Sequence, residues 1–332
     1  MEMLNKKEML SNKEEMPNKE EMPNKEEMLN KEELLTKMDI HEALAKRTQK
    51  IEEIIYYYLP EETGHQKTIF EAMNYSVKAG GKRLRPMLMQ ETYRLFGGQG
   101  EEIEPFMAAI EMIHTSSLIH DDLPCMDNDE MRRGLPTTWV KYGYDMAVLA
   151  GDALLIYAIE TAAKALSLTD NSAAVAGAIQ LLAAKTGIYG MIGGQVVDVE
   201  LTNKPIPKDK LDFIYRLKTG ALLEASMMIG ALLGGADGEQ LETVEKMAAA
   251  IGLAFQIQDD ILDVTSTPEQ LGKPVLSDEK NHKTTYVTLE GIEKARQDVA
   301  EISAQAIGLL KELPGENPFL EELIKLLITR EK

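Results

Sequence analysis

Apolar residues recur every three to four positions along most of the chain after about residue 36, which is the spacing that gathers them on one face of a helix. In one such segment the apolar positions include Phe106, Ile110 and Ile113, and in another they include Val244 and Met247. The helical segments predicted in this way are 103–120, 146–166, 211–233 and 241–264. No pair of alternating apolar and polar stretches flanks a turn in the manner of a hairpin. The pattern therefore predicts an all-α domain built from many packed helices.

The start of the chain follows a different pattern, a six-residue repeat. NKEEMP occurs twice in succession and is followed by NKEEML and NKEELL. A period of six rotates successive methionines by about 240° on a helix, so they form no apolar stripe. Pro17 and Pro23 also interrupt a helix. We therefore expect residues 1–36 to be a disordered, solvated tail and residues 37–332 to be a single all-α domain.

The composition narrows the classes of function. The chain has 332 residues, a formal net charge of -19 and one cysteine, Cys125. The acidity argues against a nucleic-acid partner, because such proteins present a basic face, and a single cysteine excludes an internal disulfide framework. No apolar run in the sequence approaches the roughly 20 residues that span a bilayer, and the start MEMLNKKEML lacks an apolar signal core. We therefore expect a cytoplasmic protein without a membrane span.

Two acidic clusters follow apolar helical segments, DDLPCMD at 121–127 and DDILD at 259–263. In the second cluster Asp259 and Asp263 are four residues apart, so both carboxylates lie on one face of a helix. Acidic side chains on an otherwise apolar helix are costly unless a cation compensates them, and carboxylate oxygens suit Mg²⁺. The alternative is that each cluster marks a solvated helix end, but two clusters in the same setting weaken that interpretation.

The first cluster is less regular. Asp121 and Asp127 are six residues apart, which does not place them on one face of a regular helix, and Pro124 lies between them. A bulge or a break in the helix would be needed to return Asp127 to the side of Asp121. Arg132 and Arg133 follow closely, and arginines beside metal-binding acids indicate an anion that both groups share.

Together these segments resemble the trans-prenyl diphosphate synthases, the family of the farnesyl and geranylgeranyl diphosphate synthases, in which two aspartate-rich motifs occur. The resemblance covers roughly residues 40–327. Its other segments are GGKRLRP at 80–86, RRG at 132–134, GDALL at 151–155, GGQVVD at 193–198, KTG at 218–220 and LGKP at 271–274. It implies an all-α helical bundle of the isoprenoid synthase type and a homodimer.

The resemblance also implies a magnesium-dependent mechanism with three Mg²⁺ ions. Asp121, Asp127 and Asp259 would hold these ions against an allylic diphosphate. Three further acids would be nearby or water-mediated ligands: Asp122, Asp260 and Asp263. Mg²⁺ usually binds through a few carboxylates together with substrate phosphates, which fits this set. The ions would make the diphosphate a leaving group, and an allylic carbocation would form.

The same resemblance assigns the cationic and polar residues to two substrates. The residues that match the allylic diphosphate site are Arg132, Lys218, Lys273 and Lys283. Those that match the isopentenyl diphosphate site are Gly81, Lys82, Arg85, His114 and Arg133. Lys218, Thr219 and Gln256 would face the carbocation, and with Arg132 they form the expected catalytic set. The departing diphosphate would act as the base, so no His–Asp pair is sought.

Four residues outside these sets leave questions open. Gln195 and Asp198 of GGQVVD either support the ligands or have a structural role. Leu276 stands where family members commonly have glycine, and a leucine in a glycine conformation with positive φ would strain or reshape the loop that carries Lys283. Cys125 lies within the first acidic motif, and we interpret it as a buried neutral thiol, because Mg²⁺ does not favour thiolate ligands.

Product length depends on the side chains upstream of Asp121, along which the growing prenyl chain would run. Five residues back is Ser116, with Ser117 beside it, and Met112 is one of the next large residues. Small residues here resemble the geranylgeranyl synthases, so we expect a C20 product, with farnesyl diphosphate as the alternative. A class I terpene synthase is disfavoured because Lys82 and its partners in the second substrate site are present. A non-catalytic helical subunit is disfavoured because both acidic clusters are kept.

Overall fold

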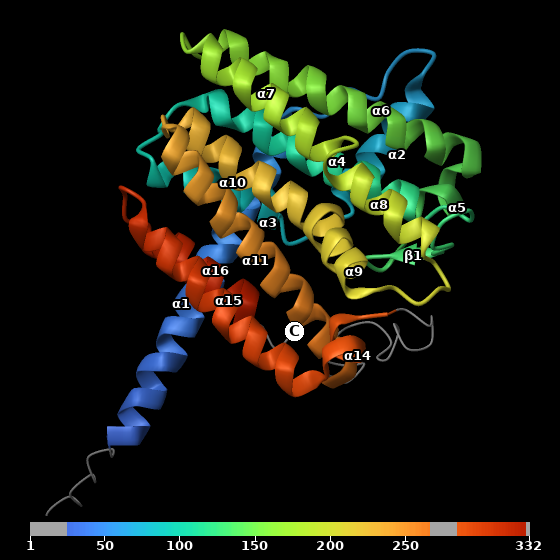
Figure 1. Ribbon diagram of the computed structural model, residues 1–332. Helices are drawn as coiled ribbons and strands as arrows, with labels where there is room; N and C mark the ends of the chain where they lie inside the picture. Colours follow the sequence, from blue (N-terminus) through green and yellow to red (C-terminus); the bar gives the residue numbers. More distant parts are fainter. Residues whose placement is uncertain (1–24, 266–283, 330–332) are drawn as a thin grey trace, which may run out of the picture. The chain divides into compact units, whose positions relative to one another are not determined.

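The protein is described here by a computed structural model, which covers the backbone of residues 25–265 and 284–329 and the side chains from residue 40 onward within them (Figure 1). The α-helices are α1 (Lys25–Tyr57), α2 (Lys67–Lys78), α3 (Leu84–Leu95), α4 (Glu104–Asp121), α5 (Thr138–Tyr142), α6 (Tyr144–Ala163), α7 (Ser172–Thr186), α8 (Met191–Glu200), α9 (Lys208–Ile214), α10 (Ala221–Leu233), α11 (Gly238–Thr265), α14 (Tyr286–Glu290), α15 (Ile292–Glu312) and α16 (Pro318–Thr329). Shorter elements are the 3₁₀ turns η1 (Glu101–Ile103) and η2 (Lys164–Ser167), the π-helical turn η3 (Tyr215–Gly220) and the strands β1 (Met131–Arg132) and β2 (Leu135–Pro136). The predicted all-α fold is confirmed. Lys273, Leu276 and Lys283 lie outside the described residues.

The chain divides into two compact units, Met1–Ala43 and Leu44–Lys332. In the first unit the structure describes only the start of α1, which begins at Lys25. The second unit contains all the other described elements. The expectation of a disordered tail over residues 1–36 stays a prediction.

The core of the second unit centres on α4 and α10. Every residue of α10 from Ala221 to Ala231 is buried, as expected for a helix that is apolar on all sides. On α4 the side chains of Phe106, Ile110 and Ile113 are fully buried, which confirms the predicted apolar face. Helix α10 packs against α3, α7 and α11, while α4 packs against α3 and α6 (Figure 1). The two central helices thus hold the bundle together around the end of α4, where the first acidic cluster begins.

Two stretches, Tyr144–Ser167 and Ser172–Glu200, are long and apolar enough to cross a membrane by length and composition alone. Core helices of soluble proteins meet the same criterion, and α6 in the first stretch packs against α2 and α4. A membrane span is therefore not strongly indicated. The apolar side chains that α6 leaves exposed need a different explanation.

A short antiparallel hairpin lies between α4 and α5, which the sequence pattern did not predict. Met131 pairs with Pro136, and Arg132 pairs with Leu135. Arg133 and Gly134 form the turn, with φ angles of 53° and 77°. Positive φ at both central residues is typical of a type I′ turn, whose twist matches that of a hairpin. Strands of two residues are too short to show an alternating pattern, so periodicity could not predict them.

The segment predicted as one helix over 211–233 is interrupted by the π-helical turn η3, between α9 and α10. A π turn adds a residue to the helical circuit and occurs often at functional sites. The backbone of α8 approaches this turn closely, since a Cβ atom at Gly194 would lie 2.3 Å from the backbone nitrogen of Lys218. A glycine at position 194 therefore allows α8 and η3 to meet.

We expect Gly230→Ala to destabilise the protein by about 1–3 kcal/mol, because an added methyl would overpack the crossing of α10 and α3. A Cβ atom at Gly230 would lie 2.3 Å from the carbonyl oxygen of Met89. The matched control is Gly308→Ala on α15, where no atom lies within 4 Å of the added Cβ. The control should raise stability by up to about 1 kcal/mol through helix propensity. Urea unfolding measures both, and a Gly230→Ala midpoint at or above wild type would contradict the packing argument.

Candidate active site

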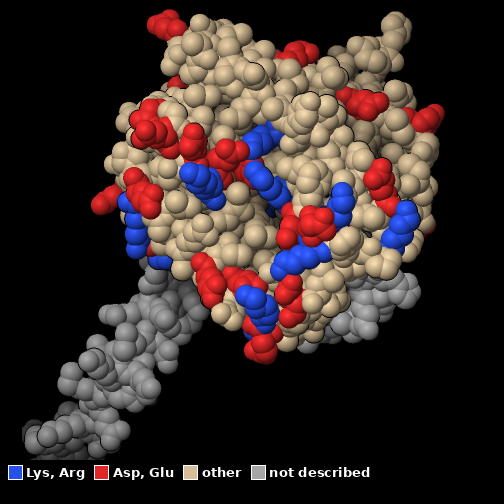
Figure 2. All heavy atoms as spheres, viewed as in Figure 1, with Lys and Arg blue, Asp and Glu red and all other residues tan. Residues whose placement is uncertain are grey.

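A cavity of about 800 Å³ opens between α4, α6, α8 and η3. Its polar end includes Arg85, His114, Asp121 and Lys218. Its apolar side is formed mainly by α6 and α8, with Val148, Leu155, Met191, Ile192, Val196 and Val199. On the face seen in Figure 2, acidic and basic side chains gather around a hollow. The cavity thus joins a charged end to an apolar channel, as a ligand with a charged head and a hydrocarbon tail requires.

The first acidic cluster folds back on itself after α4 ends. The backbone nitrogen of Asp127 donates to the carbonyl oxygen of Asp121 at 2.9 Å. The carbonyl of Leu123 accepts from the backbone nitrogens of Met126 and Asn128, at 2.8 and 3.1 Å. These bonds break the regular helix, as the sequence analysis required, and they return Asp127 to the side of Asp121.

Asp122 faces Arg132. Arg132 Nε lies 2.7 and 2.9 Å from the two carboxylate oxygens of Asp122, and Nη2 lies 2.5 Å from Oδ1. The same guanidinium lies 3.7 Å from the carboxylate of Asp129. Asp122 is buried, so the arginine supplies the compensating charge that burial demands. In this structure an acid expected near the metal and an arginine expected at the diphosphate neutralise each other.

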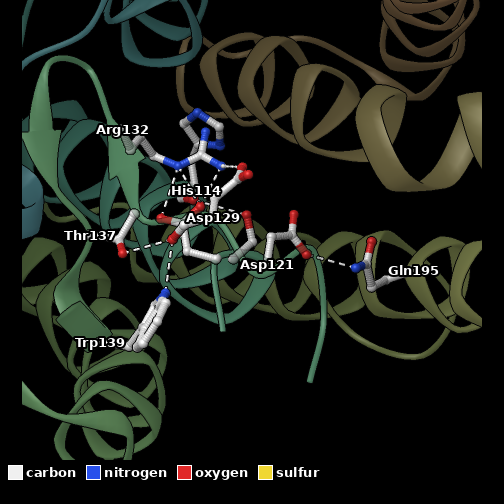
Figure 3. A network of polar contacts seen from close by, with 9 residues as sticks. His114, Asp121, Asp129, Arg132, Thr137, Trp139 and Gln195 are labelled. Atoms are coloured by element: carbon white, nitrogen blue, oxygen red, sulfur yellow. Dashed lines mark hydrogen bonds and ion pairs between the residues drawn. The ribbon is translucent and has the colours of Figure 1, made fainter. Parts of the chain in front are cut away.

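The loop that carries Asp129 is anchored by two residues that the sequence analysis missed. The hydroxyl of Thr137 and the indole nitrogen of Trp139 both donate to the carbonyl oxygen of Asp129, each at 2.8 Å (Figure 3). These bonds tie the chain before the hairpin to the chain after it. No motif pointed to them, because the acceptor is a backbone carbonyl that any residue would provide.

Asp121 and Lys218 are held by the GGQVVD segment of α8. Gln195 Nε2 donates to Asp121 Oδ1 at 2.6 Å (Figure 3), and Lys218 Nζ donates to Asp198 Oδ2 at 2.6 Å. Burial raises the pKa of Asp121 to about 6, and the charge of Lys218 acts in the opposite direction. Burial also lowers the pKa of Lys218, but nearby Asp121 and Asp198 more than offset this, so Lys218 stays charged. Gln195 and Asp198 therefore contact the site directly.

The second acidic cluster is tied to η3 and to α14. Thr219 Oγ1 donates to Gln256 Oε1 at 2.9 Å, which joins two residues expected to face the carbocation. Asp260 is buried, and its carboxylate accepts from the hydroxyl of Tyr215 at 2.5 Å and from the backbone nitrogen of Tyr286 at 2.8 Å. Asp260 therefore links three elements of the chain. Asp263 is also buried, whereas Asp259 is half-buried.

Three of the residues expected to bind the second diphosphate, Arg85, His114 and Arg133, lie near one another and form a cationic pocket. Arg85 and His114 line the cavity, and the Nε atom of Arg85 is buried without a hydrogen-bond partner in the described part of the chain. Burial and the neighbouring arginines, Arg85 and Arg133 first among them, hold the pKa of His114 well below its usual range. His114 is therefore neutral, and the unpaired donor of Arg85 marks a place for an anion. Gly81, Lys82 and Arg133 are exposed.

The residues expected to set product length lie at different depths. Ser116 and Ser117 line the cavity, and their hydroxyls donate to the carbonyls of Ile113 and His114 at 2.7 and 2.9 Å. Met112 is fully buried in the core and does not belong to the cavity lining.

The prediction of a buried thiol is wrong, because Cys125 is exposed at the cavity and accepts a hydrogen bond from the hydroxyl of Tyr144 at 3.2 Å.

The donor atoms of the site fit magnesium. Asp121, Asp127 and Asp259 offer carboxylate oxygens, the hard ligands that Mg²⁺ prefers. Within the described residues, no three His, Cys, Asp or Glu side chains are grouped so as to hold a metal by themselves. Mg²⁺ commonly completes its shell with water and substrate phosphates, so such a group is not required.

Comparison with known proteins identifies the family. The model of the family described as polyprenyl synthetase matches residues 66–317. The chain belongs to the polyprenyl synthetase family. It is 48% identical over 239 residues to the chloroplastic geranylgeranyl pyrophosphate synthase of Capsicum annuum, which covers 72% of this chain and 64% of that protein. It is 42% identical over 263 residues to the farnesyl diphosphate synthase of Geobacillus stearothermophilus, with 79% of this chain and 88% of that protein covered.

A solved structure supports the same assignment. The geranyltransferase of Helicobacter pylori, in complex with magnesium and isoprenyl diphosphate, matches with a TM-score of 0.75 at 33% sequence identity. The match covers 86% of this chain and 95% of that chain. This polyprenyl synthetase is thus a prenyltransferase of the short-chain prenyl diphosphate synthase type, in a family of magnesium-dependent enzymes.

The two adjacent acids of the synthetase, Asp121 and Asp122, should respond differently to the same substitution. We expect Asp121→Asn to raise the Mg²⁺ concentration for half-maximal activity about tenfold or more, because it removes the charge of an expected Mg²⁺ ligand. Asp122→Asn should change that concentration by less than about twofold and should lower the melting temperature, because it removes the partner of Arg132. Magnesium titrations of activity and thermal unfolding test both. Equal shifts in the magnesium titration would contradict the separation of roles.

Proposed function

We propose that the chain condenses isopentenyl diphosphate with an allylic diphosphate, with three bound Mg²⁺ ions, and that its main product is geranylgeranyl diphosphate. The observation that carries the proposal is that Asp121 and Lys218 line the same cavity as the small side chains of Ser116 and Ser117. The likeness to the Capsicum annuum enzyme, which is named a geranylgeranyl pyrophosphate synthase, supports the C20 product. The likeness to a farnesyl diphosphate synthase keeps C15 as the alternative.

The acids and cations of the site divide the chemistry between them. Asp121, Asp127 and Asp259 would hold the Mg²⁺ ions. Magnesium, when bound, neutralises the diphosphate and so favours cleavage of the allylic C–O bond. Lys218 keeps its charge beside Asp121 and Asp198, so it can bind a diphosphate oxygen. Asp198 and the incoming diphosphate would compete for Lys218. The diphosphate would therefore draw Lys218 away from Asp198.

The carbocation and the second substrate would meet different residues. Thr219 and Gln256 offer oxygens that stabilise positive charge, and their mutual hydrogen bond fixes both side chains. Arg85 and neutral His114 would donate hydrogen bonds to the diphosphate of isopentenyl diphosphate. The proton released after the alkene attacks would go to the departing diphosphate, so no further base is required.

The experiment that tests this function supplies isopentenyl diphosphate with each allylic primer, C5, C10 or C15, in the presence of Mg²⁺. Chromatography of the products should show chains that end mainly at C20. Release of hydrocarbon from an allylic diphosphate without isopentenyl diphosphate would favour a terpene synthase. Absence of product from every combination would favour a non-catalytic helical subunit.

We expect Ser116→Tyr to shorten the main product from C20 to C15, because the ring would fill the channel beside Ser117. Ser116 is buried and lines the cavity, so a large side chain at this position has no space except the channel. Ser167→Tyr is the matched control, because Ser167 is exposed on η2 and is not part of the cavity lining. Product chromatography that shows unchanged chain length for Ser116→Tyr would contradict the role of Ser116 in limiting product length.

A homodimer is part of the proposal, supported by an apolar surface on α6, α8 and the turn before α8. The exposed large apolar residues of this surface are Tyr144, Leu149, Ile156, Ile188, Tyr189, Ile192, Val196 and Val199. Ile156 on α6 and Tyr189 in the turn before α8 are 69% and 81% exposed, which is high for apolar side chains on a monomer. A second copy would cover them.

A cytoplasmic location is also proposed, on the basis of the acidic composition and the single cysteine.

We expect Ile156→Lys to dissociate the dimer, because a lysine on this surface would bury an unpaired charge when the second copy covers it. The matched control is Leu289→Lys, a similar change at a residue on α14 that is 42% exposed. Size-exclusion chromatography with light scattering should give twice the chain mass for wild type and the control, and the chain mass for Ile156→Lys. A wild-type chain that is monomeric at micromolar concentration would contradict the dimer.

A further inference from the structure

The GGKRLRP segment contains three cations, and the middle one, Arg83, is buried rather than directed to the cavity. Its side chain is 0% exposed. Nη1 donates to Glu111 Oε1 at 2.7 Å, Nη2 donates to the carbonyl of Val77 at 2.7 Å, and Nε donates to Glu52 Oε1 at 3.2 Å. Each nitrogen of the guanidinium therefore has a partner, and these partners come from three helices, α1, α2 and α4.

The flanking cations differ from Arg83 in this respect. Lys82 is exposed, and Arg85 lines the cavity with its buried Nε atom unpartnered in the described part of the chain. A buried guanidinium with three partners cannot reach a diphosphate without breaking those bonds. The resemblance assigns Lys82 and Arg85, but not Arg83, to the second substrate, and the structure gives a physical reason, because three partners hold Arg83 in place.

Arg83 also occupies a backbone conformation that needs support. Its φ and ψ angles are 49° and 36°, in the left-handed region, and it is the residue before α3 begins. A non-glycine residue keeps this conformation only where its surroundings hold it. The left-handed conformation bends the chain at Arg83. Lys82 precedes this bend and Arg85 follows it, so the relative placement of their side chains depends on it.

Glu111 connects this bend to the rest of the site. It is 2% exposed and lies on α4, one turn before His114. Its charge also acts on Arg85 and Arg133, so a buried carboxylate sits behind the cationic pocket. The bend in turn supports Arg133, whose guanidinium donates to the carbonyl of Gly80 and lies against Gly81.

We propose that Arg83 is a positioning residue for the second substrate, and that its ion pair with Glu111 fixes the loop at 80–85 so that Lys82, Arg85 and Arg133 converge on one diphosphate. The inference rests on the proposed function, because that diphosphate belongs to isopentenyl diphosphate. It adds two residues, Arg83 and Glu111, that act on this substrate without touching it. The allylic site, at Asp121 and Lys218, depends on other contacts and should not be affected.

Two substitutions that keep the charge test the pair. In Arg83→Lys the ammonium cannot bond to three partners in the planar arrangement of a guanidinium. In Glu111→Asp the shorter side chain cannot reach Arg83 at the same geometry. Each should raise the KM for isopentenyl diphosphate about tenfold, with kcat and the KM for the allylic diphosphate changed by less than about twofold. Because the charge is unchanged, a loss of long-range attraction cannot explain this result.

The double variant and a matched control make the test specific. The double variant, Arg83→Lys with Glu111→Asp, should raise the KM for isopentenyl diphosphate about as much as either single variant. The reason is that each substitution breaks the same ion pair, the one between Arg83 and Glu111. The control is Glu91→Asp, at another buried glutamate, which is bonded to Arg47, Arg94 and Asn317. The control should lower the melting temperature and leave the KM for isopentenyl diphosphate unchanged.

Three outcomes would overturn the inference. They are equal changes in both KM values, an unchanged KM for isopentenyl diphosphate with or without a loss of stability, and a Glu91→Asp effect on that KM as large as that of Glu111→Asp. Circular dichroism shows whether each variant is folded, and Glu111→Asp provides the test if Arg83→Lys does not fold. A wild-type chain that makes no product from isopentenyl diphosphate would instead overturn the proposed function, and the inference with it. An active wild type with unaltered variants would overturn the inference alone.

Discussion

The structure depends on how like charges are kept close together around one cavity. Carboxylates that crowd a half-buried site repel one another, and burial, the largest cause, together with nearby acids raises the pKa of Asp121 to about 6. The protein compensates three of the carboxylates internally, through Asp122 with Arg132, Asp198 with Lys218 and Glu111 with Arg83. Groups that are less completely compensated are the ones that we propose to bind ligands. The buried Nε of Arg85 is one such group, at the end of the cavity assigned to isopentenyl diphosphate.

The regular helices of this arrangement follow from the sequence, because burial of an apolar face requires a spacing of three to four residues. Helices α4 and α11 begin and end within three residues of the predicted segments, and Phe106 and Val244 are in the core as expected. The aspartate-rich motifs and GGKRLRP were also found from the sequence, because their residue types and order are distinctive. What the sequence could not provide was the partner of each charged side chain.

The irregular elements account for the difference between what the sequence predicted and what the structure shows. The return of Asp127 depends on a backbone hydrogen bond to the carbonyl of Asp121, which no side chain specifies. The π turn η3 has the composition of the helix around it, so periodicity predicted one continuous helix over 211–233. Arg132 was assigned from its motif position to a diphosphate, whereas in the structure it bonds to Asp122. Motif position predicts which residues gather at the site, but local backbone geometry decides what each of them contacts.

The hairpin between α4 and α5 shows how closely backbone geometry and charge are coupled. Arg132 ends β1 and bonds to Asp122, while Arg133, the next residue, starts the turn and bonds to the carbonyl of Gly80. Consecutive residues thus serve the two ends of the site, because the type I′ turn directs them to opposite sides. A one-residue shift in the hairpin would exchange their directions. The positive φ angles of Arg133 and Gly134 are therefore a constraint on charge placement as well as on chain reversal.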